Sequence, residues 1–166
     1  MEKIKRITGI IHILGIIIQN TYGLLPYNNE LIDKIYMINF AIVPLSWIIF
    51  KDECLISYLI KKMENKDYIL GENPNDVSDI SDLFNNVNEY KIFNNIKNVL
   101  RIYTFIIINN KTTKIDNNII IPTIILYLIY TYDISCNLNY RKKFYPYFQI
   151  LLSYYLLVII CKTIYN

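Results

Sequence analysis

Long apolar stretches recur along the chain and are interrupted by short charged segments. The first runs from residue 7 to residue 25 without Asp, Glu, Lys or Arg, and Lys3, Lys5 and Arg6 come immediately before it. A helix needs about 20 apolar residues to cross a hydrocarbon core. Polar and apolar residues do not alternate in these stretches, which favours helices over the strands of a membrane barrel. The pattern predicts five spans, at about residues 7–25, 33–50, 93–110, 118–135 and 147–164.

The prediction that residues 93–110 form a third span depends on where the Lys and Arg residues lie along the chain. Lys97 and Arg101 lie within this span and would have to extend toward the membrane surface. Five spans with a cytoplasmic N-terminus nevertheless place most of the 17 Lys and Arg residues, including the cluster at 141–143, on the cytoplasmic side, as the positive-inside rule requires. The C-terminus is then expected outside. Four spans, without residues 93–110, are the alternative.

Residues 51–92 form the one sizeable segment outside the predicted spans, and its second part is rich in Asp and Glu. Ile80, Leu83, Phe84 and Val87 follow one another at helical spacing and predict a short amphipathic helix. The expected fold is an all-α membrane protein, with a single membrane domain over residues 1–166. Its bundle of five (alternatively four) transmembrane helices carries this segment as a cytosolic lobe.

Composition and charge exclude several classes of protein. Hydrophobic residues make up 54% of the 166 residues and charged residues 19%, below the roughly 25% charged residues of a soluble domain. The net charge of +3 comes from clusters beside the spans, so nucleic acid is not an expected partner. The cysteines have no paired spacing, and the acidic residues lack the spacing of a calcium loop. We therefore expect no metal and no cofactor. The first span lacks a cleavage site and is expected to remain attached.

Polar side chains gather on one face of each of the first two spans. His12, Gln19 and Asn20 share a face of the first span with three glycines, and Asn39 and Ser46 share a face of the second. Small and polar residues are typical of contacts between membrane helices, so a packing face is the favoured interpretation. The alternative is a pathway or a proton-responsive site. With antiparallel spans, we expect His12 to approach Ser46, and Gln19 or Asn20 to approach Asn39.

A second candidate cluster follows the inner end of the second span and consists of Asp52, Glu53, Cys54 and Ser57. Two neighbouring carboxylates raise the pKa of a thiol and make it a poor nucleophile. The one histidine of the chain, His12, is assigned to the membrane. A Cys–His hydrolase is therefore disfavoured, and the cluster is interpreted as a charged stop at the interface, or as a docking surface.

The block Pro44–Trp47, followed by Asp52–Tyr58, resembles a pattern in small uncharacterised multi-pass membrane proteins of large, AT-rich double-stranded DNA viruses. In those proteins a span ends in an acid-Cys-aliphatic-Ser/Thr string. The resemblance implies a membrane location and a viral source, and it implies no mechanism.

Three functions are compatible with the sequence. The favoured one is a structural or interaction component of a membrane, with the lipid bilayer and a protein docked on the cytosolic acidic segment as partners. The second is a small transporter or channel that uses the polar face of the first two spans. The third, a membrane enzyme at the Asp52–Ser57 cluster, is disfavoured because no matched acid–base pair is evident.

Overall fold

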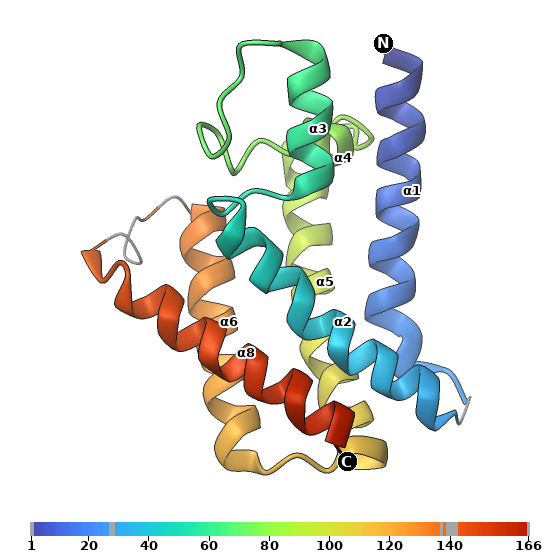
Figure 1. Cartoon of the computed structure of the whole chain (residues 1–166). Helices are drawn as coiled ribbons and strands as arrows, with labels where there is room; N and C mark the ends of the chain where they lie inside the picture. The colour runs from blue at the N-terminus through green and yellow to red at the C-terminus, as the bar shows by residue number, and fades with distance from the viewer. Residues whose placement is uncertain (1, 27–28, 137, 139–142, 166) are drawn as a thin grey trace.

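The computed structural model describes residues 2–26, 29–136, 138 and 143–165, and the side chain of Ser78 also lies outside this description. All of the regular elements described are helices, and they occur in the order shown in Figure 1. They are α1 (Glu2–Thr21), η1 (Tyr22–Leu24), α2 (Glu30–Ile49), α3 (Leu55–Glu64), α4 (Ser78–Ser81), α5 (Val87–Ile108), η2 (Asn109–Thr113), α6 (Asn117–Cys136) and α8 (Tyr147–Tyr165).

Four of the described helical segments are long and apolar enough to cross a membrane. They are Glu2–Leu24, Glu30–Ile49, Asn117–Cys136 and Tyr147–Tyr165, and they correspond to the first, second, fourth and fifth predicted spans. The third predicted span overlaps α5 over residues 93–108, and its last two residues belong to η2. Helix α5 is continuous but is not one of the four. The count of five is therefore not confirmed.

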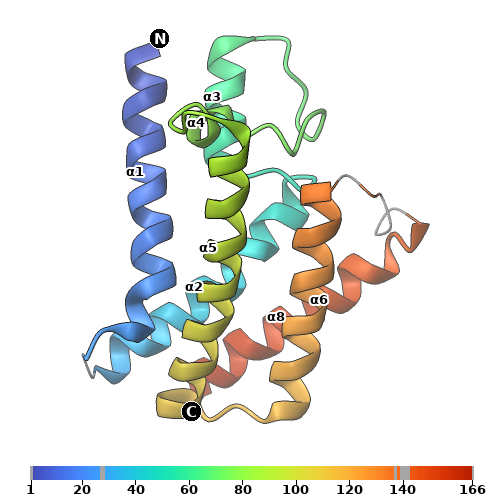
Figure 2. The same cartoon turned by 180° about the vertical axis from the view of Figure 1, so that it is seen from behind.

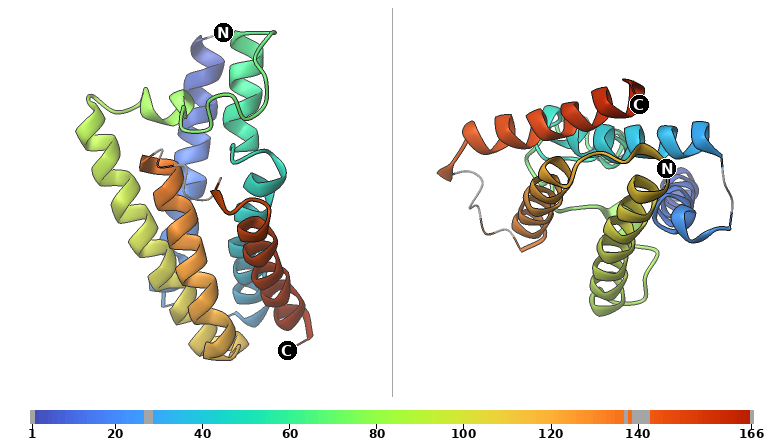
Figure 3. Two further views of the ribbon diagram at one scale, coloured as in Figure 1. Left: turned by 90° about the vertical axis from the view of Figure 1, so that its left-hand side faces the viewer. Right: turned by 90° about the horizontal axis from the view of Figure 1, so that it is seen from below.

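The long helices form two layers. In one, α2 and α8 lie side by side, and they cross obliquely over α5 and α6 (Figures 1 and 3). In the other, α1 packs along α5 (Figure 2). The shorter helices α3 and α4 lie beside the N-terminal half of α1, beyond the end of α2 (Figures 1 and 2). This position brings the segment that follows α2 against the first helix.

The core lies where α2, α5, α6 and α8 meet. The rings of Phe40 and Phe105 stack with their centroids 3.9 Å apart, and Tyr127, Leu152 and Leu156 are fully buried around them. Aromatic residues bury large areas and favour offset stacks of this kind. The core is therefore formed mainly by the second and later helices, and α1 contributes little to it.

Arg101 of α5 extends into this core. The residue is only 5% exposed, and its guanidinium lies 5.1 Å from the ring centroid of Phe40 and 5.2 Å from that of Tyr127. It also donates a hydrogen bond to the carbonyl of Phe40, at 3.3 Å. The prediction that Arg101 extends toward the membrane surface is therefore wrong. Contacts with ring faces and a carbonyl stabilise the cation inside the bundle.

The expected amphipathic helix around residues 80–87 is not formed as one element. Helix α4 is a single turn, in which Ile80 is buried. A new helix, α5, begins at Val87, where the side chain of Asn86 accepts a hydrogen bond from the backbone N–H of Glu89 at 2.9 Å. Such a cap satisfies one of the free donors at a helix start. The cap at Asn86 therefore separates the apolar residues that looked continuous in sequence.

Candidate thiol site at the start of helix α3

Three side chains from three separate segments meet beside the N-terminal half of α1. His12 lies on α1, Cys54 immediately precedes α3, and Asp79 lies on α4. The Nδ1 atom of His12 is 2.9 Å from Oδ2 of Asp79, and the Nε2 atom is 3.7 Å from Sγ of Cys54. The imidazole therefore bridges a thiol and a carboxylate through its two ring nitrogens. Thiol, imidazole and carboxylate in this order form the arrangement of a nucleophile, a base and an orienting group.

The carboxylate of Asp79 fixes the orientation of the imidazole. Asp79 is 2% exposed, and its other oxygen, Oδ1, accepts a hydrogen bond from the Ser57 hydroxyl at 2.8 Å. Burial by itself raises the pKa of Asp79, but the hydrogen bonds from His12 and Ser57 lower it overall. An ionised carboxylate only accepts hydrogen bonds, so Nδ1 of His12 carries the hydrogen. The second nitrogen, Nε2, is then the one that exchanges a proton with Cys54.

Cys54 occupies the cap position at the start of α3. Burial by itself raises the pKa of its thiol, but the hydrogen bond and charge of His12 lower it overall, assisted by the backbone N–H groups of Ser57 and Ile56. Helix N-termini and a neighbouring imidazole both favour the thiolate, which is the nucleophilic form of cysteine. The prediction that carboxylates dominate the surroundings of this thiol is wrong, because neither Asp52 nor Glu53 is directed toward it.

Gly9 allows α4 to approach α1 closely enough for the His12–Asp79 contact. It lies one turn before His12 on the same helix. A Cβ atom at this position would lie 1.9 Å from the backbone oxygen of Asp79, a distance that real Cβ atoms do not reach. Any side chain at residue 9 would therefore displace the turn that carries the carboxylate.

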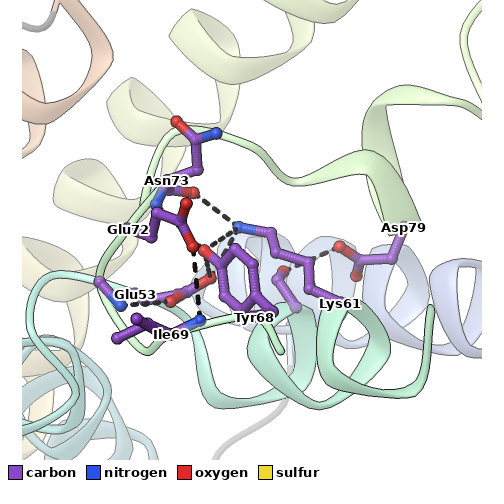
Figure 4. Close-up of polar contacts among 9 residues, drawn as sticks. Glu53, Lys61, Tyr68, Ile69, Glu72, Asn73 and Asp79 are labelled. Atoms are coloured by element: carbon purple, nitrogen blue, oxygen red, sulfur yellow. Dashed lines mark hydrogen bonds and ion pairs between the residues drawn. The ribbon is translucent and has the colours of Figure 1, made fainter. Parts of the chain in front are cut away.

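Glu53 belongs to a neighbouring buried network, which holds the loop after α3. Its Oε1 atom accepts hydrogen bonds from Lys61 at 2.6 Å and from the Tyr68 hydroxyl at 2.9 Å, and Oε2 accepts one from the Gly71 N–H at 2.9 Å. Lys61 also donates to the carbonyl of Asn73, at 2.6 Å. Figure 4 shows these groups converging, with Asp79 farther along the same face of α3. The network is a complete, buried ion pair and orders the loop that leads to α4.

The remaining predicted residues are not brought to the thiol. Asp52 accepts a hydrogen bond from the Tyr130 hydroxyl at 2.7 Å. The Ser46 hydroxyl donates to Val43 in its own helix, at 2.6 Å. Asn39 is exposed, whereas Asn20 is only 4% exposed. The expected contact between His12 and Ser46 is therefore wrong, and Asn39 forms no hydrogen bond with the buried Nε2 of Gln19 or Oδ1 of Asn20.

The buried amides of the first span have a different environment from the one expected. The backbone carbonyl of Asn20 accepts a hydrogen bond from Thr104 of α5, at 2.7 Å. The Nε2 atom of Gln19 and the Oδ1 atom of Asn20 are buried without a hydrogen-bond partner among the described residues. The polar face of α1 thus meets α5 near its C-terminal end, and α4 and Cys54 near its middle.

Asp79 is the functional residue that the sequence did not single out, because a carboxylate in an acidic segment is most simply a solvated side chain. The signal available was the spacing of Gly9 and His12 on one face of α1. The three side chains do not form a metal centre, because Cys54 and Asp79 contact opposite nitrogens of His12. Within the described part of the chain, no group of three or more His, Cys, Asp or Glu could hold an ion.

The fold and site define an all-helical protein with four helices able to cross a membrane and a Cys–His–Asp arrangement beside the first of them. Comparison of the chain with protein-family models, curated proteins and solved structures gives no match. The resemblance to viral membrane proteins therefore stays a prediction.

Proposed function

We propose that the protein is a membrane-embedded thiol enzyme of the acyl-transfer class, in which Cys54 is the nucleophile and His12 the general base. Asp79 is the positioning residue that orients His12. One observation carries the proposal: the two ring nitrogens of His12 contact a thiol and a buried carboxylate. Nucleophilic catalysis requires the imidazole to lie between the thiol and the carboxylate, whereas helix packing alone does not.

The arrangement supports a two-step reaction. Nε2 of His12 takes the proton of the Cys54 thiol, and Sγ attacks the carbonyl carbon of an ester, thioester or amide. The bond to the leaving group breaks, and His12 returns the proton to that group, leaving an acyl thioester on Cys54. Water or another acceptor then attacks the thioester, with His12 as base, and the thiol is regenerated.

We also propose that α5 crosses the membrane as a fifth span, with the N-terminus in the cytoplasm. Five exposed hydrophobic residues of α5 form a stripe at alternating steps of four and three, and they are Ile92, Ile96, Val99, Tyr103 and Ile106. The polar residues Asn88, Lys91 and Asn95, near the start of the helix, are also exposed. Arg101 is directed away from this stripe, into the bundle. From Ile96 onward, lipid would therefore meet Ile, Val and Tyr side chains although the helix carries charge. Lys3, Lys5 and Arg6 favour a cytoplasmic start.

A docking function for the acidic segment has less support. Glu64 and Asp82 both bind Lys5, at 3.2 and 2.8 Å, and Asp79 is buried at the thiol. These acids therefore satisfy partners within the chain and are less free to recognise a basic surface on another protein. A transport pathway through the polar face of α1 has no comparable support, because both ring nitrogens of His12 already contact Asp79 and Cys54.

The experiment that tests the thiol function is acylation of Cys54 by a small activated ester. In a C136S/C161S background Cys54 is the remaining thiol, and we expect p-nitrophenyl butyrate to acylate it, giving an adduct that neutral hydroxylamine removes. C54S should abolish the adduct, H12A should slow its formation by about 10²-fold or more, and D79N should slow it less. Acylation of Cys54 at equal rates with and without His12 would overturn the proposal.

A further inference from the structure

Helix α3 is inverted relative to a surface helix in water. Four of its five exposed residues are apolar: Leu55, Ile56, Leu59 and Met63 are 40%, 39%, 51% and 48% exposed. The fifth, Glu64, is the last residue of the helix. The inward residues of α3 include Ser57 and Lys61, which are 1% and 5% exposed. A helix on a soluble protein places its apolar stripe inward and its charges outward. The outer face of α3 is therefore suited to an apolar surrounding.

Two sets of contacts fix the position of α3 along α1. At the far end of α3, Glu64 lies 3.2 Å from Lys5, within the charged start of α1. At the near end, Cys54 contacts His12. His12 follows Lys5 by seven residues, which is about 10 Å along a helix axis. One leaflet of the hydrocarbon core is about 15 Å thick. If Lys5 marks the membrane surface, α3 lies at the depth of one leaflet.

The lipid bilayer is the occupant that this geometry indicates for the outer face of α3. The segment Glu2–Leu24 is itself a candidate span, and its exposed residues Ile4, Ile7 and Ile11 lie along the same length as α3. The outer face of α3 therefore lies at the same depth as an exposed apolar stretch of α1. The thiol lies at the N-terminal end of this face, which is the end farther from Lys5, because Cys54 immediately precedes Leu55.

We infer that the substrate is a long-chain acyl ester or thioester held in the membrane, with its carbonyl at Cys54 and its chain along the outer face of α3. This inference rests on the proposed function of Cys54. An acyl chain needs no hydrogen bonds and gains free energy from each methylene that contacts Leu55, Leu59 and Met63. A peptide would need partners for its backbone amides in lipid, and the described residues offer no strand edge to supply them.

The test compares acyl chains of different length on the single-thiol protein. The protein is placed in nanodiscs of ether-linked phosphatidylcholine, which contain no acyl ester, and acylation of Cys54 by p-nitrophenyl butyrate and palmitate is followed by intact mass. We expect palmitate to react about tenfold faster or more, since only a few buried methylenes suffice for this ratio. Two further arms, a palmitoyl thioester and ester-linked phosphatidylcholine, distinguish a thioester from a glycerolipid as the source of the acyl group.

Variants separate contact with α3 from simple partition of palmitate into the bilayer. We expect L59Q and M63Q to lower the ratio of palmitate to butyrate several-fold, because the palmitate rate falls more than the butyrate rate, and alkylation by iodoacetamide reports whether the thiol site is intact. The matched control is L157Q on α8, because Leu157 is 52% exposed and Leu59 is 51% exposed. A ratio near one, or the same ratio in L59Q, M63Q and L157Q, would overturn the inference and leave the thiol function standing. Failure of both esters to acylate Cys54 would overturn both proposals.

Discussion

The imidazole of His12 donates a hydrogen bond from Nδ1 to the carboxylate of Asp79, at 2.9 Å, although 67 residues separate the two in sequence. The contact joins the first helix to the single turn α4 and leaves Nε2 directed at the Cys54 thiol. Because Asp79 is almost fully buried, its partner cannot be replaced by bulk water. This relationship gives the chain one site with defined chemical roles and leads to the predictions below.

The reactivity of Cys54 should depend on pH in a direction set by His12. His12 lowers the pKa of the thiol against the opposing effect of burial. In the C136S/C161S background, we therefore expect the rate of alkylation by iodoacetamide to reach half its maximum below pH 8.5, the ordinary value for cysteine. In H12A burial is opposed only by the backbone N–H groups of Ser57 and Ile56, and the midpoint should be higher than with His12 present. Unfolding the protein in denaturant should return both midpoints to about 8.5. Identical profiles for the two folded proteins would contradict the arrangement.

Replacement of Gly9 by Ala should disable the thiol site without removing any of its functional groups. A Cβ atom at residue 9 would collide with the backbone oxygen of Asp79, so α4 must move away from α1 and His12 loses its carboxylate. We expect G9A to shift the midpoint of Cys54 alkylation toward that of H12A. The matched control is G15A on the same helix, because a Cβ atom there meets nothing within 4 Å. Equal effects of G9A and G15A would show that the α1–α4 contact is not tight.

The ion pair between Glu53 and Lys61 should be strongly coupled to stability. Both residues are buried, at 0% and 5% exposure, and K61M would leave the Glu53 carboxylate buried without a cation. Breaking one side of such a pair costs about 3–5 kcal/mol, so we expect a large decrease in the midpoint of thermal unfolding in detergent. Trypsin should also cleave at the exposed Lys66 much faster, because the loop after α3 is no longer held.

Two comparisons make this stability prediction specific. The exposed pair Glu30–Lys34 has the same chemistry at (i, i+4) spacing, with the Glu30 side chain 69% exposed, and E30Q should cost no more than about 0.5 kcal/mol. The double variant E53Q/K61M should be more stable than K61M alone, since it leaves no buried charge unpaired. If K61M and E30Q unfold at the same temperature, the pair is not buried as described.

The orientation of α5 can be tested by labelling from the two sides of the membrane. In a cysteine-free background we expect N85C and N110C, which flank α5 at exposed positions, to react with an impermeant maleimide from opposite sides of sealed vesicles. K3C serves as the reference for the cytoplasmic side, and N85C should react from the same side as K3C. Labelling of N85C and N110C from one side would show that α5 does not cross and that four spans suffice.

Several helices followed directly from local sequence. The long apolar stretches predict α1, α2, α6 and α8 within a few residues of their observed positions, because length and composition alone decide whether a helix can be surrounded by lipid. Helix α5 was also expected, at residues 93–110, but it begins earlier, at Val87. The direction of Arg101 could not be obtained in this way, since hydropathy does not show whether an aromatic pocket is available inside the bundle.

The thiol site depended on contacts between segments distant in sequence. The residue types of His12, Cys54 and Ser57 marked them as candidates, but the assignment of His12 to a lipid environment excluded it as a partner for Cys54. The return of α3 and α4 along the N-terminal half of α1 removes this objection, and the missing side chain of Gly9 permits the close approach. The sequence by itself determined that the chain forms membrane-length helices, because that property is local. Only the tertiary structure decided that thiol, imidazole and carboxylate meet, because their contact depends on how separate segments pack.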